Sequence, residues 1–78
     1  MSEDPPSVLV VEDEADLADL YAAWLGGEYD VQTAYGGHEA IEQLSDEIDV
    51  ILLDRRMPGL SGDEVLVAVR DRGIDARV

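Results

Sequence analysis

Hydrophobic residues fall into two alternating patterns along the chain: short unbroken runs and longer helical stripes. Residues 8–11 form one continuous apolar run, and residues 49–54 enclose another between two acids. Such runs are typical of strands that are covered on both faces, as in a parallel sheet. Residues 29–34 alternate between apolar and polar types, which predicts a partly exposed strand.

A helical stripe follows each of these strands. The clearest stripe repeats at i, i+3, i+4, i+7 and i+8, and Gly26 and Gly27 end it. Its members are Leu17, Leu20, Tyr21, Trp24 and Leu25, with Trp24 expected in the core. A second helix begins after Gly37 and carries the apolar residues Ala40, Ile41 and Leu44. A third helix ends near Gly73 and turns Val65, Leu66 and Val69 inward.

Residues 76–78 look like the start of a fourth strand. The alternation of strands and helices predicts an α/β fold, with a parallel sheet, helices on both faces and right-handed crossovers.

Acidic side chains stand where two of the strands end. Glu12 and Asp13 follow the first strand, and Asp54 ends the third. In open α/β sheets, ligands bind at the carboxyl ends of strands. If the first and third strands are neighbours, these three carboxylates converge. A hard divalent cation such as Mg²⁺ would relieve their mutual repulsion.

This arrangement suits phosphoryl transfer, in which a carboxylate oxygen attacks in line while a metal ion neutralises developing charge. Asp54, at the end of a rigid apolar strand, is the expected nucleophile, and Glu12 and Asp13 are the expected metal ligands.

The composition narrows the functional classes. The 78 residues suffice for one small domain. The chain has no cysteine and a single histidine, His38, which argues against a zinc site. The net charge of −14, from 19 acidic and 5 basic residues, repels nucleic acid and anionic membranes. The acidity fits either solubility or adaptation to a high-salt cytoplasm.

The sequence also bears on location. No apolar run approaches the length of a membrane span, and the acidic N-terminal tail, residues 1–7, differs from a secretory signal. A cytoplasmic location is therefore expected.

Two segments resemble the receiver domains of response regulators in two-component signalling. Residues 8–14 resemble their first strand and acidic pair, and residues 51–62 resemble their phospho-acceptor strand and the loop after it. Met57-Pro58-Gly59, with Gly62 three residues on, is the most distinctive part. The resemblance spans residues 8–78, which form a partial receiver domain.

The resemblance implies that Asp54 accepts a phosphoryl group from the phosphohistidine of a histidine kinase. It implies that Glu12 and Asp13 bind Mg²⁺ together with Asp54 and the backbone carbonyl of Arg56. The implied fold is a flavodoxin-like, doubly wound parallel sheet with strand order 2-1-3 and a truncated fourth strand. Such a module catalyses only its own phosphorylation and hydrolysis and is not an enzyme acting on an external substrate.

The sequence departs from the family in what it lacks. Receiver domains carry a Ser or Thr after strand four and a Lys after strand five, whereas this sequence has no lysine and stops within strand four. The alternative reading is therefore a truncated or degenerate receiver that acts only as an interaction module. An open sheet edge also predicts self-association or strand exchange with another copy. A transcriptional output domain in a longer chain is compatible with the family, although no residue here indicates one.

Three other readings fail on specific residues. Residues 13–16 spell the D-E-A-D of helicases, but that chemistry needs a phosphate-binding loop with a lysine. A haloacid-dehalogenase-like phosphatase needs a second Asp where Arg56 stands. An EF-hand needs a central glycine and a distal Glu that residues 12–16 do not supply.

Overall fold

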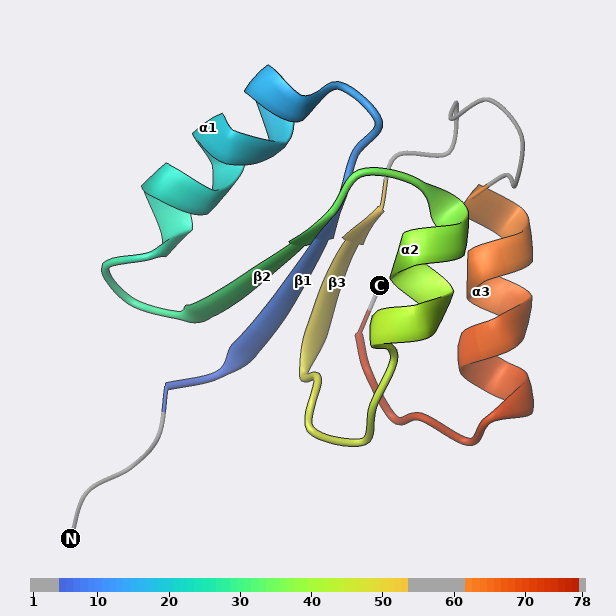
Figure 1. Ribbon diagram of the computed structural model, residues 1–78. Helices are drawn as coiled ribbons and strands as arrows, with labels where there is room; N and C mark the ends of the chain where they lie inside the picture. The colour runs from blue at the N-terminus through green and yellow to red at the C-terminus, as the bar shows by residue number, and fades with distance from the viewer. Residues whose placement is uncertain (1–4, 54–61, 78) are drawn as a thin grey trace, which may run out of the picture.

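The computed structural model describes residues 5–53 and 62–77, which form three strands and three helices in alternation (Figure 1). In chain order these are β1 (Ser7–Val11), α1 (Ala15–Leu25), β2 (Asp30–Ala34), α2 (Gly37–Gln43), β3 (Val50–Leu53) and α3 (Gly62–Asp71). The three strands and three helices predicted for residues 8–73 are present, and the first residue of each strand differs from the prediction by one. None of the described helices is both long enough and apolar enough to cross a membrane.

The three strands form one parallel sheet in the order β2-β1-β3. In β1, Val8 pairs with Val31 of β2 on one side and with Val50 of β3 on the other. Beyond β3, Arg77 forms an isolated parallel bridge with Val50. The predicted order 2-1-3 is confirmed, and the start of a fourth strand lies beside β3 as expected.

The helices cover the two faces of the sheet unequally: α1 lies on one face, and α2 and α3 lie on the other (Figure 1). Because side chains alternate along a strand, β1 contributes to both layers. Leu9 and Val11 join the core under α2 and α3, whereas Val8 and Val10 pack with Ala18 of α1. This two-sided burial explains why β1 is apolar throughout.

The expected burial of Trp24 is wrong. Its side chain is 69% exposed, and Leu20, one turn earlier, is 43% exposed. The residue of α1 that is fully buried against the sheet is Ala18, with Tyr21 and Leu25 packed beside it. The helix is thus rotated so that one edge of its apolar stripe faces away from the sheet.

The chain leaves α3 through a glycine turn that returns it to the sheet. Gly73 has a φ of 68°, in the left-handed region that glycine adopts without a steric penalty. The N–H of Gly73 donates to the carbonyl of Arg70 (3.1 Å), and that of Ile74 donates to the carbonyl of Val69 (3.1 Å). This is the Schellman arrangement, and its apolar contact is present because Ile74 and Val69 share one core.

Candidate functional site

Glu12 is the first residue after β1, and it is fixed through both its backbone and its side chain. Its N–H donates to the carbonyl of Ala34 at the end of β2 (3.0 Å). Its carboxylate oxygen Oε1 accepts a hydrogen bond from the N–H of Glu14 (3.3 Å). The residue is only 6% exposed, which makes it the buried acid among the described residues. A charge this buried needs compensating partners, and the N–H of Glu14 is one of them.

Asp13 and Glu14 form the connection from β1 to α1. Asp13 is exposed, whereas Glu14 is the N-cap residue of α1 and its carbonyl accepts from the N–H of Ala18 (3.0 Å). The N-terminus of a helix carries partial positive charge, which stabilises nearby carboxylates. Glu12 and Asp13 therefore lie where the N-terminus of α1 reduces the repulsion between their negative charges.

The ends of β1 and β3 lie side by side. Val11, the last residue of β1, is in register with Leu53, the last residue of β3. The residues that follow them in the sequence are Glu12 and Asp54. Asp54, Arg56 and the loop of residues 57–59 lie outside the described residues, so their predicted roles stay predictions. The condition set by the sequence, that the first and third strands be neighbours, is met.

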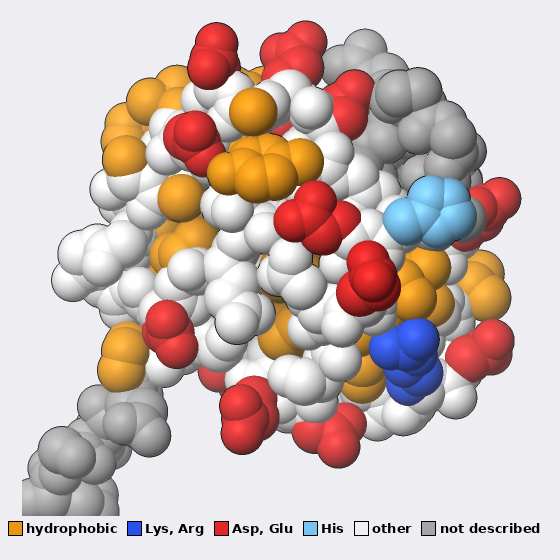
Figure 2. Space-filling view, viewed as in Figure 1, with side chains coloured by type: hydrophobic (Ala, Val, Ile, Leu, Met, Phe, Trp, Pro, Cys, Tyr) orange, Lys and Arg blue, Asp and Glu red, His pale blue; other side chains and the backbone are white. Residues whose placement is uncertain are grey.

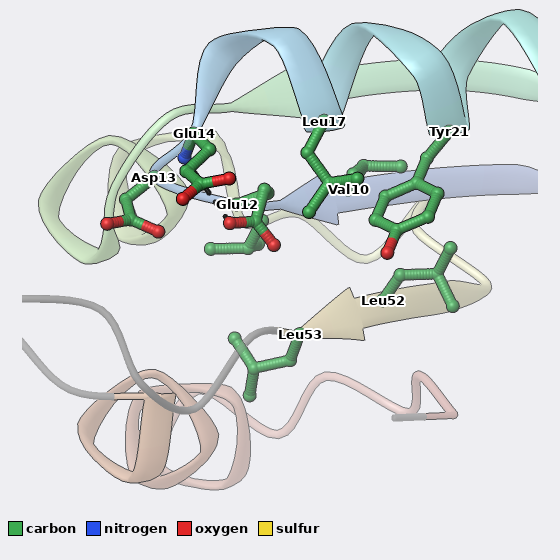
Figure 3. A pocket seen from close by; sticks show the side chains of 9 residues that line it. Val10, Glu12, Asp13, Glu14, Leu17, Tyr21, Leu52 and Leu53 are labelled. Carbon is green, nitrogen blue, oxygen red and sulfur yellow. Dashed lines mark hydrogen bonds between the residues drawn. The ribbon is translucent and has the colours of Figure 1, made fainter.

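A pocket of about 600 Å³ opens beside these strand ends, between α1 and the sheet (Figure 3). Its lining consists of Val10, Val11, Glu12, Asp13, Glu14, Leu17, Tyr21, Leu52 and Leu53. One end is acidic, where Glu12 reaches into the space between the ends of β1 and β3 with Asp13 further out (Figure 3). The other end is apolar and is formed by Leu17, Tyr21 and Leu52.

The donor set suits Mg²⁺, because carboxylate oxygens are the hard ligands that this ion prefers. Glu12 and Asp13 supply such oxygens at one end of the pocket. Residues 5–53 and 62–77 contain no group of three or more His, Cys, Asp or Glu side chains that could hold a metal. Of the predicted ligands, only the side chains of Glu12 and Asp13 are among the described residues, so the full ligand set stays a prediction.

Sequence reasoning missed two features near the site. It placed Leu17 and Tyr21 on the apolar stripe of the first helix but did not predict that both also line a pocket. It also gave no role to Tyr35, whose hydroxyl donates to the Oδ1 atom of Asp19 on α1 (2.8 Å). The period of a helix predicts an apolar face but not a cavity beside it, and no local pattern marks a hydrogen bond between residues 16 positions apart.

The family model for the response regulator receiver domain matches residues 8–78. The chain belongs to this family. The resemblance to receiver domains is thus confirmed. The strand order β2-β1-β3, together with the similarity to solved receiver structures, shows a flavodoxin-like fold.

Relatives of this receiver domain span several organisms. A candidate transcriptional regulator of the haloarchaeon Haloferax volcanii is 58% identical over 72 residues, which cover 91% of this chain and 12% of the relative. A crystal structure of the response regulator TrrA of Thermotoga maritima in complex with Mg²⁺-BeF is 36% identical, with a TM-score of 0.80. The match covers 91% of this chain and 64% of that one.

TrrA also matches this receiver domain in its crystal structure with the histidine kinase ThkA, at 38% identity and a TM-score of 0.78. That match covers 91% of this chain and 63% of the other. The receiver domain described here therefore spans less than two thirds of the length of these relatives, and a small fraction of the Haloferax volcanii protein.

Proposed function

We propose that this chain is the phospho-acceptor module of a two-component phosphorelay, in which Asp54 receives a phosphoryl group from a histidine kinase. The observation that carries the proposal is the register of Val11 with Leu53, because the residues that follow these two are the acidic Glu12 and Asp54. Membership of the receiver family supports the same assignment.

Each site residue has a role in this proposal. Glu12 and Asp13 would hold Mg²⁺ through carboxylate oxygens, and Asp54 and the backbone carbonyl of Arg56 would complete the protein ligands. When bound, Mg²⁺ neutralises negative charge on the phosphoryl oxygens. The hydrogen bond from the N–H of Glu12 to the carbonyl of Ala34 holds its backbone, and the one that its carboxylate accepts from the N–H of Glu14 orients its side chain before any ligand arrives. This reduces the reorganisation that binding requires.

The transfer itself is a single displacement at phosphorus. A carboxylate oxygen of Asp54 attacks the phosphorus, the bond from phosphorus to the donor's histidine nitrogen breaks, and the electron pair returns to the imidazole. Water later attacks the aspartyl phosphate, which restores the carboxylate and releases inorganic phosphate. The chain then acts only on its own phosphoryl group and not as an enzyme with an external substrate.

Two structures of one relative, TrrA, support the choice of cofactor and partner. TrrA was crystallised with Mg²⁺-BeF, and in another structure with the histidine kinase ThkA. By analogy we assign to this chain a Mg²⁺ requirement and a kinase as phosphodonor. A cytoplasmic location is a further part of the proposal. So is a link to transcription, which the name of the Haloferax volcanii relative suggests.

Intact mass spectrometry after incubation with Mg²⁺ and acetyl phosphate tests the proposal. We expect one added phosphoryl group that hydroxylamine removes and that is absent from Asp54→Asn. Asp13→Asn should slow labelling by about tenfold or more, since even outer residues of metal sites have effects of this size. Asp16→Asn is the matched control, because it removes the same charge from an exposed position in the first turn of α1.

Label that persists in Asp54→Asn would refute the assignment of the acceptor. If no label forms with acetyl phosphate or with a phosphorylated histidine kinase, the alternative of a non-signalling interaction module is favoured instead.

A further inference from the structure

The segment that carries the acidic pair is held at both ends by two consecutive residues. At its start, the N–H of Glu12 donates to the carbonyl of Ala34 (3.0 Å). At its far end, Asp19 of α1 accepts a hydrogen bond from the hydroxyl of Tyr35 (2.8 Å). Ala34 and Tyr35 thus fix residues 12–19 against the carboxyl end of β2.

Tyr35 is itself fixed from two directions. Its backbone N–H donates to the Oε2 atom of Glu39 in the first turn of α2 (3.2 Å). Its hydroxyl oxygen accepts from the hydroxyl of Thr33 on β2 (3.4 Å). The ring is therefore held at its backbone and at its tip, and it can act as a rigid spacer rather than as a mobile surface side chain.

The hydrogen bonds continue into α2. The amide nitrogen Nε2 of Gln43 donates to the carbonyl of Thr33 (3.1 Å) and to the Oε1 atom of Glu39 (3.4 Å). Through Tyr35, this network connects α1 with α2, although the two helices cover opposite faces of the sheet (Figure 1). It therefore passes around the carboxyl end of β2, next to the acidic pair.

We infer that Tyr35 is a positioning residue for Glu12 and Asp13, and this inference rests on the proposed function as a metal-dependent phospho-acceptor. The hydroxyl of Tyr35 fixes α1 at Asp19 relative to β2, and α1 in turn fixes the connection on which Glu12 and Asp13 lie. Removing the hydroxyl widens the range of positions that the two carboxylates sample, so cation binding weakens.

The effect on global stability should be small, which separates positioning from folding. Asp19 is exposed and Tyr35 is 40% exposed, so water can replace the lost hydrogen bond. Tyr35→Phe also leaves the net charge unchanged. Any change in cation affinity therefore reflects the geometry of the acidic pair and not the electrostatic field of the chain.

The first experiment measures the affinity for Mn²⁺ and Mg²⁺ by titration calorimetry, under conditions where circular dichroism shows every variant to be folded. Tyr35→Phe should weaken binding by about two- to tenfold, which is the range to which the net free energy of one hydrogen bond converts. Tyr29→Phe is the matched control. It makes the same chemical change just before the opposite end of β2 and should leave the affinity unchanged.

Asp19 allows a second comparison. Asp19→Asn keeps an oxygen that can accept from Tyr35, whereas Asp19→Ala does not. The affinity of Asp19→Ala should fall below that of Asp19→Asn, and Asp19→Ala combined with Tyr35→Phe should bind no more weakly than Asp19→Ala alone. Additive losses in the double variant would overturn the inference.

Hydrogen exchange provides a readout that does not depend on metal. In the metal-free chain, the amides of residues 13–18 should exchange about two- to tenfold faster in Tyr35→Phe than in Tyr29→Phe. Equal exchange in the two variants, or equal cation affinity in Tyr35→Phe and the unmodified chain, would overturn the positioning role. Failure of the unmodified chain to bind either cation would instead count against the proposed function, and exchange would still decide the role of Tyr35.

Discussion

The two faces of the sheet are made from the same strands but differ in how completely they are covered. Under α2 and α3, ten of the described residues form one buried cluster, which draws on all three strands. Under α1, only Val8, Val10 and Ala18 are buried together. The difference lies in the covering helices, since β1 presents two residues of similar hydrophobicity to each side.

Adjacent residues of β3 show this difference most sharply. Ile51 is 1% exposed and belongs to the cluster under α2 and α3, whereas Leu52 points to the other face and is 41% exposed. Both are large and aliphatic. Burial of an apolar strand residue is therefore decided by what covers it and not by its own type.

Truncation of Ile51 and of Leu52 should reveal the difference in packing between the two faces most strongly. Ile51→Ala should lower the free energy of unfolding by about 2–5 kcal/mol, because it leaves a cavity in a closed core. Leu52→Ala should cost less than about 1.5 kcal/mol, because the side chain is already partly in water. Urea denaturation followed by circular dichroism measures both.

If Ile51→Ala does not fold, Ile51→Val provides the smaller change, with an expected loss of about 0.5–1.5 kcal/mol. Equal losses for Ile51→Ala and Leu52→Ala would show that the two faces are equally well packed, contrary to the structure.

Within α1, the residue that contacts the sheet should matter more than the largest apolar residue. Ala18 is fully buried, and Ala18→Leu should destabilise by about 1–3 kcal/mol through overpacking. Trp24→Gln should change stability by about 0.5 kcal/mol or less, because the ring is 69% exposed. Thermal unfolding of both variants tests this, and a large loss in Trp24→Gln would restore the original prediction that Trp24 lies in the core.

The smallest expected effect is weak self-association through the less covered face. Leu20, Trp24 and Leu52 are exposed apolar residues on α1 and β3. On the face drawn in Figure 2, acidic side chains lie around the exposed apolar ones. At low salt, the net charge of −14 opposes contact between copies. Raising KCl from about 0.1 M to 1 M shortens the screening length from about 10 Å to about 3 Å, so sedimentation velocity should show more dimer.

Substitution of Leu52 and Trp24 by serine should reduce that dimer without changing the net charge. Val67→Ser is the matched control, because Val67 is also apolar and 57% exposed but lies on α3, on the other face. A dimer that depends on Val67 instead would place the contact on the well-covered side. A chain that stays monomeric at every salt concentration would contradict self-association altogether.

The sequence predicted the elements because each one carries a local signal. The continuous run at Val8 to Val11 indicated a strand buried on both sides, and glycines marked the ends of α1 and α3. It also indicated that Glu12 follows a strand, since the change from apolar to acidic residues occurs within one position. Such signals involve neighbours in the chain and can be read without a fold.

The rotation of α1 was not predictable in the same way. A helical period defines a stripe that spans a range of angles, and Trp24 and Ala18 lie on different sides of it. Which side faces the sheet depends on the strands beneath α1. A small residue such as Ala18 allows the close approach of helix and sheet, but alanine carries no distinctive pattern in the sequence.

By itself, then, the sequence determined the order of strands and helices, the family and the positions of the acids at strand ends. Only the tertiary structure decided that Val11 and Leu53 lie in register, that the face under α1 stays partly open, and that Tyr35 holds Asp19. The physical reason is that local patterns report the conformation and burial of one segment. Register, helix rotation and side-chain hydrogen bonds depend on the relative placement of segments far apart in the chain.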